Sequence, residues 1–223
     1  LIYSAIIQSI LSYSYQRRTI IMDKNELNSL FKSAIPNVTY RLADTSDASE
    51  LLKIYEPYVK NTAVTYEYDV PSVEEFASRI EDVLTKFPYI AVLINGRISG
   101  YAYAHAFHPR AAYSWCAELS IYLSDNCHGM GIGRELYGIM EQLLREQHIL
   151  NLYACVAYTE FEDEYLTQAS VHFHEHMGFK ICAHLHECGY KFGSWYDMVY
   201  MEKTIGPHVP FMDKVIPFPK LIS

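Results

Sequence analysis

The chain is short of glycine, proline and positive charge. Its 223 residues include only 10 Gly and 9 Pro, too few for a collagen-like or low-complexity disordered chain. Lys and Arg number 18 against 26 Asp and Glu, which gives a formal net charge of -8. A protein that neutralises nucleic-acid phosphates through its bulk charge needs the opposite balance. We therefore expect no nucleic-acid partner.

Cysteine pairs and long apolar runs are also scarce. The five cysteines are odd in number and none are spaced as C-x-x-C, which argues against a disulfide framework or a zinc ribbon and favours reduced thiols in a cytoplasmic protein. Residues 1–15 are apolar-rich but shorter than the ~20 residues that span a bilayer. Arg17 and Arg18 follow this stretch, the reverse of a secretory signal. We expect no membrane association.

What the chain does have is hydrophobic material and tyrosine. Half of the residues are hydrophobic, and a chain of this length can bury a core without disulfides or metals. Its 20 Tyr fit a Tyr-rich pocket or interface, or equally an ordinary core in a Tyr-rich chain.

Three segments follow from composition. Residues 1–37 form an N-terminal extension, in which Met22 resembles a natural start, so residues 1–21 are an over-long start or an additional helix. Residues 38–205 form the main domain. Residues 206–223 form a Pro-rich C-terminal arm that we expect to be extended.

Periodicity and turn residues predict the elements of the main domain in the order β-α-α-β-β-β-α-β-α-β-β. Ser72 to Glu75 is a capping box, Asn95-Gly96 marks a hairpin, and Pro57 should end or kink its helix. The predicted helices cover 23–34, 47–57, 72–87, 134–148 and 168–177, and the strands cover 38–43, 89–94, 98–107, 113–123, 152–157, 179–191 and 195–202.

The fold class is therefore mixed α/β (α+β), with a largely antiparallel central sheet flanked by helices. One parallel step is expected, where the helix at 134–148 joins the strand 113–123 to the strand 152–157.

Three glycines, Gly129, Gly131 and Gly133, lie where a strand turns into a helix. Glycine lets the backbone approach an anion, and helix N-terminal N–H groups point at it. No Lys-Ser/Thr follows, so the turn is not a P-loop. It is not a dinucleotide fingerprint either, because the preceding strand belongs to a meander and no acidic residue closes the strand 152–157. A purely structural turn remains the alternative.

This turn resembles the acetyl-CoA pyrophosphate loop of GNAT N-acetyltransferases, usually Gln/Arg-x-x-Gly-x-Gly/Ala, with His128 where Gln or Arg is usual. From Tyr40 to Lys203 the chain resembles the phosphinothricin/methionine sulfone acetyltransferase branch. The blocks that carry this resemblance are Ile54-Tyr55, Thr65-Tyr66-Glu67, Gly100 to Ala104, Pro109 to Tyr113, Glu118 to Tyr122, Ala169-Ser170-Val171, His174-Glu175, Gly178-Phe179 and Gly189 to Asp197.

The resemblance implies that acetyl-CoA binds in a cleft between the central strands. Thr167 replaces the Asn that is usual in this branch, and the acidic loop 158–166 is longer than usual, so substrate preference could differ. The implied cofactor-binding residues are Ile121, Tyr122, Leu123, His128, Gly129, Met130, Gly131, Ile132, Gly133, Arg134, Thr167 and Ser170.

Amine acetylation needs a base, and the thiolate leaving group benefits from a proton. The resemblance implies that Glu118 is the general base. Burial in the middle of a strand would raise the pKa of a glutamate toward a value that suits a base. A solvated Glu on a half-exposed strand is the alternative. The resemblance makes His174 the acid or hydrogen-bond donor, where many GNAT enzymes have Tyr.

The matched blocks place the substrate-pocket candidates at Tyr66, Arg110, Tyr113 and Tyr122. Arg110 would fork two hydrogen bonds to a carboxylate or phosphinate, or else is a surface arginine. Lys191, Trp195 and Asp197 are assigned to the final hairpin and a dimer contact.

We expect no metal. His172 and His176 share a helix face from which His174 points away, so the three cannot converge. A two-His site at His172 and His176, or at His184 and His186, is the alternative.

The sequence therefore predicts a cytoplasmic, homodimeric, acetyl-CoA-dependent N-acetyltransferase. The resemblance implies a small amino-acid-like amine of the phosphinothricin, methionine sulfone or methionine sulfoximine type. Polyamines, aminoglycosides and protein N-termini are the rival substrates within the same activity. A non-catalytic CoA-binding module and a metal-binding protein are the rival functions.

Overall fold

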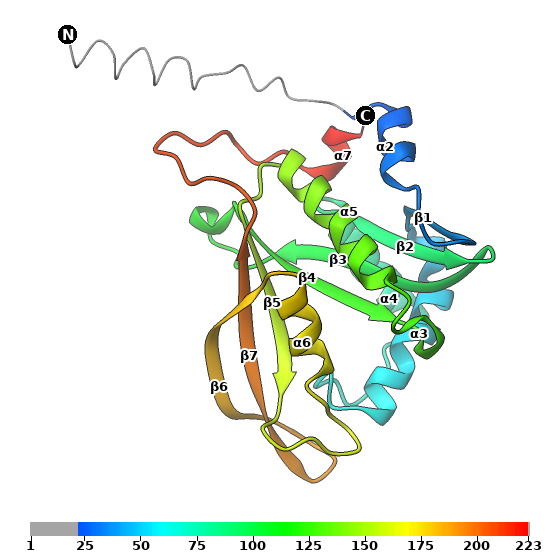
Figure 1. The fold of residues 1–223 in the computed structure, drawn as a ribbon, viewed down its shortest axis with the longest axis vertical. Helices are drawn as coiled ribbons and strands as arrows, with labels where there is room; N and C mark the ends of the chain where they lie inside the picture. Colours follow the sequence, from blue (N-terminus) through cyan, green and yellow to red (C-terminus); the bar gives the residue numbers. More distant parts are fainter. Residues whose placement is uncertain (1–21, 223) are drawn as a thin grey trace.

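A seven-stranded sheet organises the protein, and the computed structural model describes it within residues 22–222. The strand order is β1-β2-β3-β4-β5-β7-β6, antiparallel except between β4 and β5 (Figure 1). This confirms the predicted fold class and its single parallel step. The strands are β1 (Val38–Leu42), β2 (Tyr89–Ile94), β3 (Arg97–Ala106), β4 (Cys116–Leu123), β5 (Asn151–Tyr158), β6 (Lys180–Lys191) and β7 (Ser194–Thr204).

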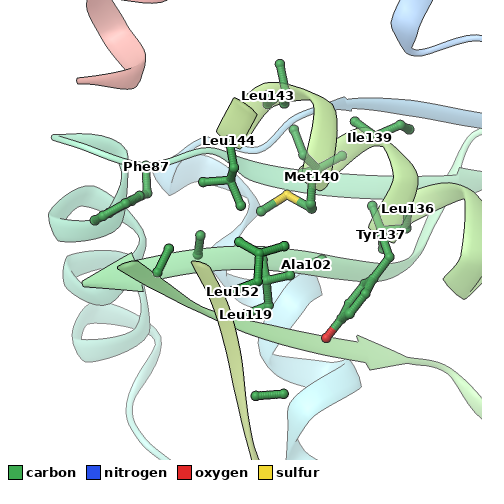
Figure 2. Packing of buried hydrophobic residues seen from close by; sticks show 14 of the residues in the cluster. Phe87, Ala102, Leu119, Leu136, Tyr137, Ile139, Met140, Leu143, Leu144 and Leu152 are labelled. Atoms are coloured by element: carbon green, nitrogen blue, oxygen red, sulfur yellow. The ribbon is translucent and has the colours of Figure 1, made fainter. Parts of the chain in front are cut away.

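Helices cover both faces of the sheet, because its central strands are apolar on both sides. On β2, Ile90 and Val92 pack with the long helix α5, whereas Tyr89 and Ala91 pack with α3 and α4 on the other face. Figure 2 shows the α5 side chains meeting the sheet. The helices are α2 (Lys24–Leu30), α3 (Ala48–Asn61), α4 (Val73–Leu84), α5 (Ile132–Glu146), α6 (Ala169–His176) and α7 (Phe218–Leu221).

The parallel strands β4 and β5 pair only at their beginnings. The register joins Cys116 to Asn151, Ala117 to Leu152 and Glu118 to Tyr153, and no further pair follows. Beyond Glu118 the two strands diverge (Figure 1). We call this opening the fork; its arms are residues 119–123 of β4 and 154–158 of β5. The backbone groups that face into it lack a partner strand, so the fork can accept an extended ligand.

Two local predictions need correction. The strand predicted from residue 113 starts at Cys116, because Ala111–Tyr113 forms a 3-10 turn after the break at Pro109. Pro57 does not end its helix, which continues to Asn61. The lost hydrogen bond would have been accepted by the carbonyl of Lys53. Both residues lie on the exposed face, where water can replace the bond.

The C-terminal segment folds back onto the domain. Residues 206–217 contain neither helix nor strand, as expected of an arm, but Phe218 and Leu221 are buried in the main core. The Leu221 carbonyl accepts a hydrogen bond from the N–H of Met22 (2.7 Å), so both ends of the described chain meet there. Residues 1–21, which we interpreted as an over-long start or an additional helix, lie outside the described residues. Between residues 22 and 222, no helix is long and apolar enough to cross a membrane.

Candidate active site

Glu118 stands where the fork opens, as the last residue of β4 that pairs with β5. Its side chain is 16% exposed, and Oε1 lies 3.5 Å from Nε2 of His105, its cross-strand neighbour on β3. Desolvation lowers the pKa of His105, but the hydrogen bond and the charge of Glu118 outweigh it, so that the pKa is raised overall. The pair is thus a carboxylate beside an imidazole that gains a proton more readily than usual.

A phenol completes the surroundings of Glu118. Burial, the Cys155 thiol and the charge of Glu118 raise the pKa of Tyr200 on β7 to about 12. The hydroxyl therefore stays protonated at neutral pH. Glu118 is then the group in this cluster that can carry negative charge and accept a proton.

His174 is buried and lies between two partners. Nδ1 lies 2.7 Å from the carbonyl oxygen of Ser170, and Nε2 lies 2.9 Å from the hydroxyl of Tyr137 on α5. A carbonyl only accepts, so Nδ1 carries the proton and Nε2 of the neutral ring accepts from Tyr137. Burial lowers the pKa of His174, which keeps it neutral.

Tyr137 reaches from α5 toward the sheet, past the aliphatic layer of the core (Figure 2). Tyr137 and His174 line one pocket together with Ser120 and Ile121 of β4 and Cys155 of β5. A proton donor and its acceptor therefore meet inside the fork.

The glycine turn leads directly into α5. Gly131 is the N-cap residue with φ 84°, and no side chain caps the helix. Gly129 also has a positive φ of 73°, a conformation that glycine adopts without penalty. A Cβ at Gly133 would lie 3.0 Å from the Phe173 ring of α6, so this glycine lets α6 approach. The turn thus offers uncapped N–H groups at the positive end of a helix dipole.

The predicted cofactor residues fall into two groups around these features. Ile121 to Leu123 lie on the β4 arm of the fork, and residues 128–134 form the turn and the first residues of α5. Ser170 lines the fork pocket. Thr167 is exposed before α6, where its Oγ1 accepts from the N–H of Ala169 (3.4 Å).

The substrate candidates are more dispersed. The Tyr122 ring packs edge-on against Tyr55 and Tyr58 in the core on the α3 face, so its backbone is better placed than its ring to meet a ligand. The Tyr66 hydroxyl donates to the carbonyl of Asp197 (2.6 Å). Arg110 and Tyr113 are exposed in the loop before β4. The roles of these four remain predictions.

Sequence reasoning did not identify His105, Tyr137 or Tyr200. His105 becomes a candidate only once the β3–β4 register places it opposite Glu118. Tyr137 has the helical spacing of an ordinary core residue, and most of its ring is indeed core. Only its contact with His174 sets it apart.

Comparison with known proteins gives one consistent picture. The family model described as acetyltransferase (GNAT) domain matches residues 40–200. The chain is 24% identical over 166 residues to the phosphinothricin N-acetyltransferase of Streptomyces viridochromogenes, covering 74% of this chain and 87% of the relative. It is 27% identical to the L-methionine sulfoximine/L-methionine sulfone acetyltransferase of Salmonella typhimurium, covering 77% and 96%.

Solved structures agree. The crystal structure of a GNAT superfamily phosphinothricin acetyltransferase from Sinorhizobium meliloti, in complex with AcCoA, is similar with a TM-score of 0.73 and 29% identity. The match covers 83% of this chain and 98% of that one. The N-acetyltransferase from Staphylococcus aureus matches with a TM-score of 0.70 and 26% identity, covering 76% and 99%.

Proposed function

Because the chain belongs to the GNAT acetyltransferase family, we propose that it transfers the acetyl group of acetyl-CoA to the primary amine of a small amino-acid-like substrate. The observation that carries the proposal is the position of Glu118, a partly buried carboxylate where the fork opens. The relatives act, by their names, on phosphinothricin and on methionine sulfoximine or sulfone. We propose the same substrate class here.

The residues present fit acetyl-CoA as co-substrate. The glycine turn presents N–H groups without a side-chain cap, which suits a pyrophosphate. On its β5 side, the β4 arm of the fork has no partner strand, which suits the amide-bearing pantetheine. His128 replaces the usual Gln or Arg, but backbone N–H groups supply most of the phosphate contacts, so the fit is preserved.

Glu118 takes the proton of the attacking amine, directly or through water. The charge of His105 then determines whether the Glu118 carboxylate is free to act as the base. A protonated His105 would hold the carboxylate in an ion pair, whereas a neutral His105 would leave it free to accept a proton.

On the other side of the reaction, the Tyr137 hydroxyl lies in the fork pocket and would turn its single proton from Nε2 of His174 to the thiolate that leaves. His174 acts on Tyr137 as a positioning residue, since its Nε2 holds that hydroxyl at 2.9 Å. In this proposal Tyr137 is the proton donor, a role that the sequence predicted for His174. His174 instead orients the Tyr137 hydroxyl.

The substrate needs a cation for its carboxylate. Arg110 is our candidate, because a guanidinium binds a carboxylate or phosphinate with two parallel hydrogen bonds. Its place in the exposed loop before β4 would allow it to approach a bound amino acid from outside the fork.

A thiol-release assay with acetyl-CoA tests the proposal against phosphinothricin, methionine sulfone, methionine sulfoximine, polyamines, aminoglycosides and N-terminal peptides. We expect turnover with the first three. Glu118→Gln should lower kcat by ~10²- to 10⁴-fold while acetyl-CoA affinity stays within a few-fold. Glu81→Gln, on the surface of α4, is the matched control.

Preference for a polyamine or aminoglycoside would refute the substrate class. Binding of acetyl-CoA without turnover of any amine would instead indicate a non-catalytic CoA-binding module. Near-full activity of Glu118→Gln would place the base elsewhere.

A further inference from the structure

Two histidines and an aspartate converge on the β6–β7 hairpin. Nε2 of His184 lies 2.6 Å from Oδ2 of Asp197, and Nδ1 of His186 lies 3.3 Å from the same oxygen. One ligand atom from each of the three residues lies within 4.8 Å of the others. We propose that His184, His186 and Asp197 bind a divalent transition-metal ion of the zinc type, at a site that the transferase chemistry does not use.

The backbone explains why these side chains meet. His184 and His186 are two residues apart on β6, so both point to one face of the sheet. Asp197 projects from the neighbouring strand β7, beside the irregularity in register between Leu185 and Gly189. The His186 imidazole is 72% exposed and is free to adjust, whereas the other two ligands are more enclosed.

The distances suit a small tetrahedral site. With metal–nitrogen and metal–oxygen bonds of about 2.0–2.2 Å, the ligand atoms of a tetrahedral zinc site stand about 3.3 Å apart. The distance from His186 Nδ1 to Asp197 Oδ2, 3.3 Å, equals this value, whereas the distance from His184 Nε2, 2.6 Å, would have to lengthen when a metal enters. A small rotation of the exposed His186 ring closes the remaining gap between the two imidazoles. The fourth position faces solvent and would hold water.

The carboxylate is already oriented. Its other oxygen, Oδ1, accepts a hydrogen bond from the N–H of Glu187 (2.7 Å), which fixes the side chain as outer-sphere contacts do in metal sites.

The two imidazoles lie side by side, with their ring centroids 4.0 Å apart. Neutral imidazole is the form that binds metals, and it suits zinc, copper and nickel. A cation shared by both rings and the carboxylate would satisfy all three groups at once.

The site lies on the other face of the sheet from the Glu118 cluster, because Asp197 and Tyr200 are three residues apart on β7 and their side chains point to opposite faces. It adjoins the β5 arm of the fork, where the His184 ring packs edge-on against Tyr158 at a centroid distance of 5.1 Å. Tyr200 belongs to the Glu118 cluster. A bound metal would instead fasten the edge strand β6 to β7 across its irregular register. This inference departs from the expectation that the protein holds no metal, because Asp197 supplies a third ligand that the sequence spacing did not reveal.

The test is calorimetry with ZnCl₂ on the full chain, prepared without a histidine tag and stripped of metal. We expect one strong site. His184→Ala and His186→Ala should each weaken it by at least ~10- to 100-fold, the loss typical of outer-sphere changes in metal sites. Asp197→Asn, which keeps an acceptor for the Glu187 N–H, should weaken it similarly. Circular dichroism verifies the fold of each variant.

Two control variants make the test decisive. The double variant His172→Ala/His176→Ala removes the histidine pair of α6, and Cys188→Ser removes an exposed thiol two residues from His186; both should bind zinc as the parent does. Zinc should also raise the Tm of the parent and not that of His186→Ala. Zinc affinity unchanged in His184→Ala and His186→Ala, or lost in either control, would overturn the proposal.

Discussion

At the scale of single residues, the chemistry of Glu118 depends on a neighbour from another strand. The hydrogen bond and the charge of Glu118 raise the pKa of His105 against the desolvation that lowers it. Below the pKa of His105 the carboxylate is held in an ion pair. Above it, His105 is neutral and the ion pair is lost, which would leave the carboxylate free for its proposed role as base.

This coupling predicts a pH effect for His105→Asn, which keeps a hydrogen-bond donor and removes the titrating charge. The folded pKa of His105 lies above its ordinary value of 6.5. The ratio of kcat/KM of the parent to that of the variant should therefore rise as pH increases through the region just above 6.5. Taking the ratio cancels the titration of the substrate amine. A ratio constant from pH 5.5 to 8.5 would show that His105 does not modulate the base.

The pKa of His174 is lowered rather than raised, and this shift affects how the stability of the protein depends on pH. Burial lowers its folded pKa below 6.5, so as pH falls below 6.5 the unfolded chain takes up this proton first and the folded state loses stability. The contribution is complete above pH 6.5 and declines as pH falls toward the folded pKa.

We therefore expect the Tm of the parent to fall more steeply between pH 7.5 and 5.5 than that of His174→Phe. Scanning calorimetry across this range measures both slopes, and the remaining histidines contribute equally to each protein. Parallel slopes would mean that His174 is not kept neutral by its surroundings. His176→Phe, on the exposed side of α6, is the control and should keep the slope of the parent.

At the scale of elements, the turn before α5 combines a left-handed backbone with an uncapped helix end. Gly131→Asp would put a side chain on a residue with φ 84° and a carboxylate where we propose that the pyrophosphate binds. Acetyl-CoA affinity, measured by calorimetry, should fall well over tenfold with the circular dichroism spectrum retained. Each tenfold corresponds to 1.4 kcal/mol.

Gly138→Asp is the matched control, since it adds the same charge to an exposed position of the same helix with open space around it. Its acetyl-CoA affinity should stay close to that of the parent. Equal losses in both variants would point to general electrostatic repulsion rather than a phosphate site at the turn.

The sequence predicted the elements better than their contacts. Each strand and helix of the main domain was expected near its observed place, because apolar period and turn chemistry are local signals. The His105–Glu118 pair depends on strand register, which no local pattern specifies. Lys191 shows the same limit: it was assigned to the hairpin, but its buried ammonium donates to the carbonyls of Val59, Thr62 and Thr65, each at 2.8 Å.

At the scale of the whole molecule, the two ends of the described chain contribute to one core. Gln147 is buried after α5, and its Nε2 donates to the carbonyls of Lys86 and Ile216. The C-terminal segment is thereby fixed over the sheet, with Phe218 1% exposed beneath it. The division at residues 37/38 and 205/206 remains a prediction, but Phe218 and Leu221 near the end of the C-terminal segment are buried in the core.

Phe218→Ala should accordingly destabilise the protein by about 3–5 kcal/mol, the usual cost of emptying a buried aromatic site. Urea unfolding measures this loss. Phe211→Ala in the same segment is the control, because Phe211 is 91% exposed and should change stability by less than about 0.5 kcal/mol. Similar small effects of both changes would show that the segment is dispensable for the core.

Between the first four strands of the sheet and the last three, the described ladder has three residue pairs, all at the beginnings of β4 and β5. If acetyl-CoA binds in the fork as proposed, it would bridge the two halves of the sheet at the place where their pairing is weakest. A co-substrate that binds the folded chain alone, at 100 times its Kd, adds about 2.7 kcal/mol to the free energy of unfolding. The proposed site would then link the lifetime of the folded protein to the supply of acetyl-CoA.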